Sequence, residues 1–103
     1  MFMIVVKKCG PASFADAFSD EFWARYNEEY TSVPLDVKLT RRDPLMIRLV
    51  TELRGDAGRF NAIFGIVSIP DEFAEDYRVV NEPSMNCDRV ELFKDEEWVF
   101  YSY

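Results

Sequence analysis

Apolar residues gather in two short runs that are typical of buried strands. The first covers residues 2–9 (FMIVVKKC) and stops at Gly10-Pro11, a pair that interrupts regular structure. The second covers residues 61–69 and stops at Pro70, which cannot donate the next hydrogen bond of a strand ladder. The sequence therefore predicts two apolar strands, one at the start of the chain and one in its second half.

The clearest helix follows Asp43. This residue suits the N-cap, Pro44 suits the first helical position, and Gly55 suits the C-terminal stop. Apolar residues recur on one face of the predicted helix at Leu45, Met46, Leu49, Val50 and Leu53. The spacing predicts a helix that packs this face against a sheet.

A second helix is predicted upstream from a stripe of aromatic residues. Five aromatic side chains are spaced by four residues: Phe14, Phe18, Phe22, Tyr26 and Tyr30. This spacing places them on one slowly rotating helix face, which is more typical of a core than of a ligand platform. Either Ser19 or Ser13 can cap this helix, and the sequence leaves the choice open.

The last third of the chain alternates polar and apolar residues as strands do. Residues 77–81 and 89–93 flank a turn-like segment, EPSMNCD, and residues 98–103 add a further strand. The pattern predicts an α+β fold, in which two helices pack on one face of a four- to five-stranded, mostly antiparallel or mixed sheet. We expect a single domain over residues 1–103, with one core that contains Phe22, Leu45, Leu49, Leu53, Ile63 and Ile66.

The composition adds a cellular setting to this fold. With 49% hydrophobic and 16% aromatic residues, the chain has enough apolar material for one compact core. The opening apolar run is followed at once by Lys7 and Lys8, so it is too short to span a bilayer and lacks the form of a secretion signal. We therefore expect a cytoplasmic protein without membrane contact. Cys9 and Cys87 form no C-x-x-C motif, which predicts two unpaired thiols.

Several classes of catalytic site are excluded by the residues that the chain lacks. It has no histidine, which removes Ser-His-Asp and Cys-His catalysis and histidine-bearing zinc sites. It also has no Gly-x-Gly-x-x-Gly or P-loop motif. Cys9 lies close to two lysines but has no base to activate it, so we interpret it as a packed residue. We predict a protein that is not an enzyme and that uses no cofactor or metal.

The charge is divided unevenly along the chain. Residues 1–70 carry nine acidic and nine basic residues, whereas residues 71–103 carry ten acidic residues against three basic ones. The final third therefore accounts for the whole formal net charge of −7. Such a field repels nucleic acid and attracts cationic surfaces, which argues against direct nucleic-acid binding and favours a basic protein partner.

The densest acidic segment follows the second apolar strand, in IVSIPDEFAED (residues 66–76). Glu72, Glu75 and Asp76 would share one face of a helical turn, as a weak Ca²⁺ or Mg²⁺ site or a catalytic carboxylate pair requires. The segment lacks the interleaved ligands and the turn glycine of a calcium loop. We interpret it as the end of a strand followed by a solvated acidic surface.

Much of the chain resembles a group of small proteins of tailed phages and prophages. The similar segments are RRDPLMIRLVTELRGDAGRFNAIFGIVSIPDEFAEDYRVVNE and VELFKDEEW, after a first strand of the IVVKKCG kind. The matching residues are Cys9, Gly10, Arg41 or Arg42, Asp43, Pro44, Glu52, Leu53, Ile69, Pro70, Asp71, Tyr77, Glu91 and Trp98. Proteins of this group usually have a Tyr-Asp-Gly hairpin turn and a histidine near the last tryptophan, and this chain has neither. The resemblance implies a phage accessory protein in the cytoplasm of an infected bacterium, and its motifs carry no enzyme signature.

Two functions fit this setting, ahead of a metabolic catalyst, which the absence of histidine makes the weakest interpretation. The first is an inhibitor that binds the basic surface of a host or anti-phage defence enzyme. Its predicted contacts are Asp71, Glu72, Glu75, Asp76, Asp95, Glu96 and Glu97.

The second function is an oligomeric sponge that sequesters a small, nucleotide-like signalling molecule. Lys38, Arg41 and Arg42 would contact its phosphates, and Tyr30 or Tyr77 would provide a platform for its base. Because a small chain with many aromatic residues commonly buries some of them between subunits, we also predict a homodimer.

Overall fold

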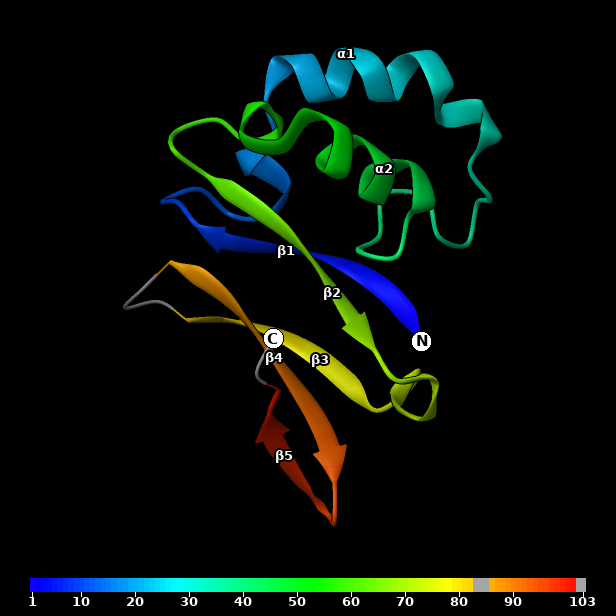
Figure 1. Ribbon diagram of the computed structural model, residues 1–103, viewed down its shortest axis with the longest axis vertical. Coiled ribbons are helices and arrows are strands. Elements are labelled where there is room, and N and C mark those ends of the chain that lie inside the picture. Colours follow the sequence, from blue (N-terminus) through cyan, green and yellow to red (C-terminus); the bar gives the residue numbers. More distant parts are fainter. Residues whose placement is uncertain (83–85, 102–103) are drawn as a thin grey trace.

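The computed structural model describes residues 1–82 and 86–101, and within them the chain forms an α+β fold of two α-helices and five strands (Figure 1). The strands are β1 (Phe2–Cys9), β2 (Ile63–Ile69), β3 (Tyr77–Glu82), β4 (Cys87–Lys94) and β5 (Glu97–Phe100). The α-helices are α1 (Asp20–Glu29) and α2 (Pro44–Leu53). Short 3₁₀ helices lie between them: η1 (Ala15–Ala17), η2 (Tyr30–Ser32), η3 (Arg54–Ala57) and η4 (Asp71–Phe73).

The strands form two separate antiparallel sheets. One contains β1 and β2, and the other has the order β3-β4-β5. The prediction of a single four- to five-stranded sheet is therefore wrong, although the α+β class is confirmed. The two predicted hairpin strands pair as expected, and the turn between them includes residues 83–85, which lie outside the described part of the chain.

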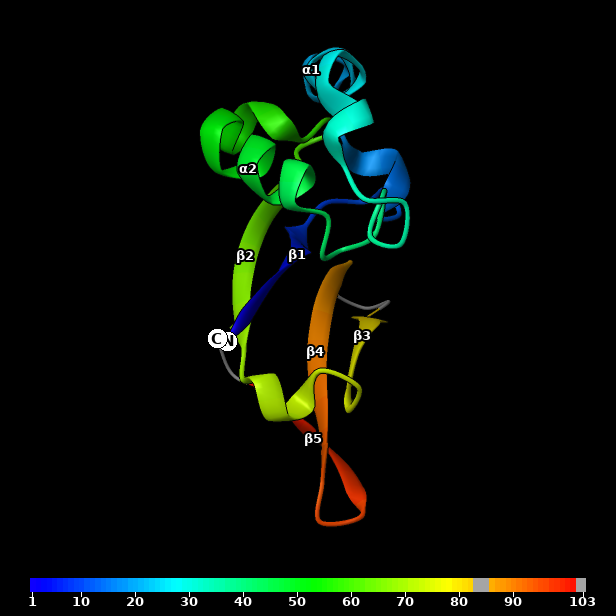
Figure 2. The same cartoon turned by 90° about the vertical axis from the view of Figure 1, so that its right-hand side faces the viewer.

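The sheets are separate because both faces of the β1–β2 sheet are covered. Val5, Phe64 and Ile66 point from one face toward α1 and α2, whereas the alternating neighbours Ile4 and Val67 point from the other face toward β4. Figures 1 and 2 show the helices at one end of the molecule and the β3-β4-β5 sheet on the other side of β1 and β2. The β1–β2 sheet is thus the middle layer of three.

Two hydrophobic cores follow from these layers. The helix-side core contains Val5, Ala17, Phe18, Phe22, Tyr26, Val33, Leu45, Met46, Leu49, Val50, Ala57, Ala62 and Phe64. The sheet-side core contains Ile4, Val6, Val67, Ile69, Val90 and Leu92.

The predicted core is largely confirmed on the helix side. Phe22, Leu45 and Leu49 are buried there, and Leu53 and Ile66 pack against them partly buried. The prediction that Ile63 lies in this core is wrong, because its side chain is 51% exposed. Ile63 is four residues before Val67 in β2, so both side chains point to the same face of the sheet, away from the helices. At the start of the strand, Ile63 lies beyond the sheet-side core.

Capping side chains fix where the two α-helices begin. Ser19 caps α1, since its Oγ accepts a hydrogen bond of 3.2 Å from the Phe22 amide. Ser13 instead bonds Asp16 in η1, so the open choice between the two serines is resolved. Of the aromatic stripe, Phe18, Phe22 and Tyr26 are buried, Phe14 is partly buried, and Tyr30 is exposed.

The second helix begins as predicted and ends differently. Asp43 caps α2 by accepting hydrogen bonds from the amides of Leu45 and Met46, at 2.9 and 3.3 Å. The helix ends at Leu53, and the residue that leaves it with a positive φ of 51° is Arg54. Gly55, the predicted stop, lies in η3. Within the described residues, no helix has the length and apolar character needed to cross a membrane.

Candidate interaction surfaces

Seven of the ten acidic residues of the last third occupy the end of the molecule that lies away from the helices. One group lies on η4 and the bend after it, and the other lies on the turn between β4 and β5 (Figures 1 and 2). The two segments meet where the Phe93 amide donates a hydrogen bond of 2.7 Å to the Asp76 carbonyl. All seven predicted partner contacts are exposed. We call these seven residues the acidic end: Asp71, Glu72, Glu75, Asp76, Asp95, Glu96 and Glu97.

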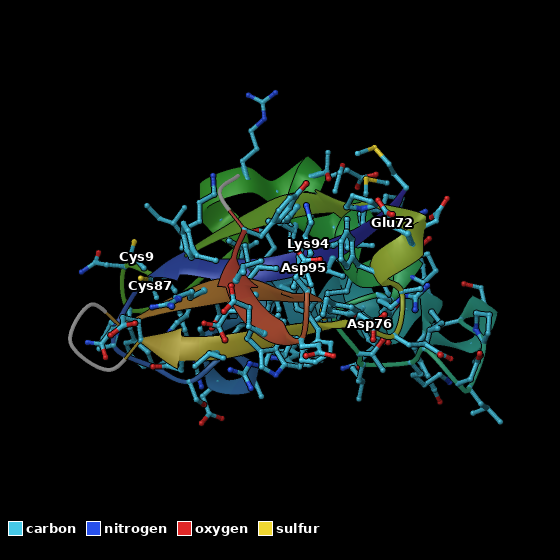
Figure 3. The ribbon with its side chains drawn as sticks, turned by 90° about the horizontal axis from the view of Figure 1, so that it is seen from below. Cys9, Glu72, Asp76, Cys87, Lys94 and Asp95 are labelled. Atoms are coloured by element: carbon cyan, nitrogen blue, oxygen red, sulfur yellow. The ribbon has the colours of Figure 1, made fainter. Side chains whose placement is uncertain are left out.

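The acidic end presents its carboxylates side by side and does not converge them on one point. Figure 3 looks at this end and shows Glu72, Asp76 and Asp95 spread across it, with Lys94 beside Asp95. Because η4 stops at Phe73, the spacing of three acids on one helical face is not realised. Within residues 1–82 and 86–101, no three acidic, cysteine or histidine side chains gather in a way that holds a metal ion.

The turn between β4 and β5 has an unusual backbone. Lys94 pairs with Glu97, which leaves only Asp95 and Glu96 in the turn, and both have a positive φ, of 54° and 65°. A two-residue turn of this kind matches the twist of the strands, but it normally carries Asn or Gly because a side chain makes positive φ unfavourable. The first position of such a turn also accepts Asp, so the unfavourable residue is Glu96, which stands where Gly is most stable.

The basic residues of the alternative site lie apart. Lys38 Nζ lies 4.7 Å from the centroid of the Tyr30 ring, so these two predicted contacts are brought together. The Arg42 guanidinium lies 4.3 Å from the centroid of the Phe2 ring. The Phe2 ring in turn packs against the Tyr77 ring, with 5.5 Å between the two centroids. Arg41, by contrast, points into the interior between the layers. The three cations thus have three different surroundings.

Arg41 holds the free edge of β1. Its Nη1 donates to the Val5 carbonyl at 3.0 Å and to Asp88 Oδ2 at 2.8 Å, while its own carbonyl accepts from the Val5 amide at 2.9 Å. The same Asp88 oxygen accepts from the Lys7 amide at 2.7 Å. Asp88 begins the buried part of β4, so this cluster joins β1, the 30–43 connector and the second sheet. Its geometry explains Arg41 as a structural residue.

Lys7 is buried at 1% exposure and has a structural explanation of its own. Its Nζ donates to the carbonyls of Gly10 and Ala12, so the ammonium ties the segment after β1 back onto the strand. Cys9 follows after an irregularity in the strand pairing, with its Sγ 3.7 Å from the Asn61 carbonyl. Cys9 and Cys87 are both free thiols, as predicted, and Figure 3 labels them at the same side of the molecule.

A second buried carboxylate organises the helical layer. Asp43 is fully buried and accepts hydrogen bonds from the Tyr26 hydroxyl, the Leu39 amide and the two amides that it caps. Burial, together with the hydrogen bond and the negative charge of Asp43, raises the pKa of Tyr26 to about 12. Tyr26 therefore stays protonated and keeps donating to Asp43 well into the alkaline range.

The outward face of the second sheet carries a network that the sequence analysis missed. Its residues alternate with those of the sheet-side core: Arg78, Val80 and Glu82 of β3, Arg89, Glu91 and Phe93 of β4, and Trp98 and Phe100 of β5. We call this the outer sheet face. The alternation of charged and apolar residues within residues 89–93 indicates that this strand has an outward polar face. A count of charges along the chain shows only the acidic runs and does not predict the ion pairs between strands.

Ion pairs and aromatic contacts interlock on the outer sheet face. Glu91 accepts from Arg78 at 2.7 Å and from Arg89 at 2.9 Å, and Arg89 also approaches Glu82 at 3.4 Å. The hydrogen bond from Arg78, aided by the charges of both arginines, lowers the pKa of Glu91. The Arg78 guanidinium lies 4.2 Å from the Trp98 ring, and that of Arg89 lies 5.4 Å from the Phe100 ring.

A shallow pocket of about 240 Å³ lies beside the start of α2. Its lining residues are Ser32, Val33, Pro44, Leu45 and Arg48. Arg48 is paired with Glu29 at 2.5 Å, and this hydrogen bond lowers the pKa of Glu29. The pocket contains none of the predicted phosphate contacts.

No protein-family model, curated protein or solved structure matches this sequence.

Proposed function

We propose that this chain is a protein-binding inhibitor of a host or anti-phage defence enzyme and that it docks through its acidic end. The observation that carries the proposal is the meeting of two acidic segments, 71–76 and 95–97, at one end of the molecule, with every carboxylate exposed. Like charges placed together on a surface build a negative potential that attracts a cationic protein and accelerates its association. The groove of a nucleic-acid-binding enzyme offers such a cationic surface.

The backbone of the turn between β4 and β5 supports this role. Asp95 and Glu96 occupy two successive positions of positive φ, where glycine or asparagine is more stable. Strained positions are common where a segment has a binding function, because the surrounding structure holds them in place. Here the hydrogen-bonded ladder of β4 and β5 supports the turn from both sides.

Within the described residues, the carboxylates of the acidic end form a single ion pair. Asp71 forms this exposed pair, of 2.8 Å, with the amino group of Met1. An exposed pair of this kind contributes little to stability and exchanges readily for another partner. The docking surface therefore centres on Glu72, Glu75 and Asp76 in one segment and on Asp95, Glu96 and Glu97 in the other.

The test compares two variants with the same net charge. The first replaces four carboxylates of the acidic end: Asp76→Asn, Asp95→Asn, Glu96→Gln and Glu97→Gln. The matched control replaces four exposed carboxylates of the first 70 residues: Glu21→Gln, Glu28→Gln, Asp36→Asn and Asp56→Asn. Each protein is immobilised and exposed to bacterial lysate, and captured proteins and copurified small molecules are identified by mass spectrometry.

We expect the wild type and the control to retain the same basic enzyme, inhibit its activity and release it as salt rises, because attraction between surface charges is screened over about 10 Å at 0.1 M salt. The first variant should stay folded and lose the enzyme. Full retention and inhibition by the first variant would contradict the proposal. Copurification of a nucleotide, lost on Lys38→Ala and unaffected by either set of changes, would favour the sponge instead.

A further inference from the structure

The outer sheet face is a second exposed surface, with a chemistry unlike that of the acidic end. Phe93, Trp98 and Phe100 are 40%, 37% and 59% exposed, and Val80 beside them is 37% exposed. Aromatic residues and arginine are the residue types that contribute most at protein interfaces. This face therefore has the composition of an interface, while its charges come in both signs.

We propose that the outer sheet face binds the same face of a second copy of this chain, to form a twofold dimer. A twofold interface places one surface against itself, so it must be complementary to itself. The face carries two arginines and two glutamates that already pair with one another, and its net charge is zero. The acidic end cannot meet its own copy in this way, because its carboxylates would repel each other.

A buried donor on this face points to a missing acceptor. Among the described residues, Arg89 Nε is the one buried side-chain nitrogen or oxygen without a hydrogen-bond partner. Buried donors are nearly always paired in folded proteins, and an unpaired one has to be explained. Because Arg89 Nε is already shielded within one copy, the second copy can supply this acceptor only if the Arg89 side chain changes its rotamer on association.

The area of the face sets the strength of the dimer. Two sheets that pack face to face lie about 10 Å apart with interdigitated side chains. Covering the exposed parts of three aromatic rings removes on the order of 300 Å² per copy, and Val80 and the stems of the two arginines extend this area. The rings alone therefore bury about 600 Å² in both copies together, and the added area brings the total toward, but still below, the roughly 1,200 Å² of the smallest stable interfaces. We therefore expect a dissociation constant in the micromolar range.

Sedimentation equilibrium of the full chain, from about 1 to 200 μM, tests the proposal across that range. The wild type should change from monomer to dimer. Phe100→Glu and, separately, Val80→Lys each bury an unpaired charge in the interface and should each raise the dissociation constant at least about thirty-fold, the size of a hot-spot effect. The matched control is Phe60→Ser, because Phe60 is 61% exposed in the segment before β2 and should leave the constant unchanged.

Circular dichroism checks that each variant keeps its fold, and the two face variants give independent readings if one of them does not. A wild type that is monomeric at about 200 μM overturns the proposal. So does a dimer that persists in folded Phe100→Glu and Val80→Lys, or one that Phe60→Ser weakens equally. Because the face is neutral, raising NaCl tenfold should change the constant less than about threefold. A larger loosening would overturn the proposal, because it would show that attraction between unlike surface charges holds the copies together.

Discussion

The two sheets of this molecule differ in how many of their faces are buried, although their strands are of similar length. The β1–β2 sheet is covered on both faces and its strands are mostly apolar. The β3-β4-β5 sheet is covered on one face, and its residues largely alternate between apolar side chains that face the core and polar or aromatic side chains that face outward. The first sheet is a scaffold between two cores. The second packs one face against the scaffold and leaves the other face exposed, as it does the acidic end. Burial on both faces therefore marks the structural strands, and burial on one face marks the strands that carry both proposed interfaces.

The largest expected effect compares matched leucines of the two cores. Leu49 is fully buried among the thirteen residues of the helix-side core, and Leu92 is 6% exposed in the six-residue sheet-side core. Leu49→Ala should lower the free energy of unfolding by about 3–5 kcal/mol and Leu92→Ala by about 2–3 kcal/mol, since the cost grows with the cavity left behind. Urea denaturation measures both.

The control for this pair is Leu35→Ala, because Leu35 is 86% exposed. It should change the free energy of unfolding by less than about 0.5 kcal/mol. A cost below about 1 kcal/mol for Leu49→Ala would mean that the packed face of α2 is wrongly assigned. Equal costs at Leu49 and Leu92 would remove the difference between the cores.

The next effect breaks the joint between the two sheets. Asp88→Ala leaves the Lys7 amide and the Arg41 guanidinium without the oxygen that they share. Removing one partner of a buried pair costs about 3–5 kcal/mol, and the partial exposure of Arg41 reduces this to about 2–3 kcal/mol. Asp88→Asn retains an acceptor oxygen and should cost less, about 1 kcal/mol.

Thermal denaturation of Asp88→Ala, Arg41→Ala and the double variant measures this joint. The double variant should be less destabilised than the sum of the two single variants, because each single change already removes the interaction. Strictly additive costs would show that Arg41 and Asp88 do not stabilise each other.

Alkaline pH should weaken the helical layer through Tyr26. The pKa of Tyr26 is raised to about 12 in the folded chain, above its ordinary value of 10.0. Between these values the unfolded chain loses the tyrosine proton and the folded chain keeps it, so the unfolded state binds fewer protons and stability falls as pH rises. The contribution is complete below pH 10 and lost as pH passes the folded pKa.

Urea denaturation from about pH 8 to 11 measures this dependence. Tyr26→Phe should be less stable than the wild type at pH 8 by about 1 kcal/mol, the value of one hydrogen bond, and should show a flatter loss at higher pH. Tyr30→Phe, which alters an exposed tyrosine, is the matched control and should follow the wild type. Identical slopes for all three proteins would contradict the assignment.

The smallest effect on stability concerns the turn between β4 and β5. Replacing Asp95-Glu96 with Asn-Gly should stabilise the chain by about 1 kcal/mol, because this pair favours positive φ at both positions. The same change should weaken binding of the captured enzyme. Phe60→Gly relieves positive φ at a turn without acidic residues, so it should stabilise to a similar degree and leave binding intact. A turn variant that gains stability and binds as well as the wild type would separate strain from function.

The sequence predicted the local structure better than the arrangement of layers. The bounds of β1 and the cap of α2 follow directly from Gly10, Asp43 and Pro44, whose effects act on their immediate neighbours. The division into two sheets does not follow, because alternation tells which residues are buried and leaves open what covers them. The sidedness of Ile63 was missed for that reason.

The candidate surfaces divide in the same way. The exposure of the acidic residues could be predicted from their charge, and the meeting of segments 71–76 and 95–97 required the strand pairing. Arg41 was assigned to a ligand because a run of basic residues in a connector resembles a surface. Its contacts with Val5 and Asp88 join chain segments that are distant in sequence, so no local sequence pattern predicts them.

The position of Arg41 also bears on aggregation. An apolar strand with an unpaired edge is a template on which other chains add strands, and β1 is among the most apolar segments of this protein. Its outer edge is closed by one arginine, through main chain and side chain together, and by the carboxylate of Asp88. Substituting Arg41 removes the side-chain part of this closure and frees the Val5 carbonyl, so the variant is expected to aggregate more readily than the wild type even at temperatures where most of its chains remain folded.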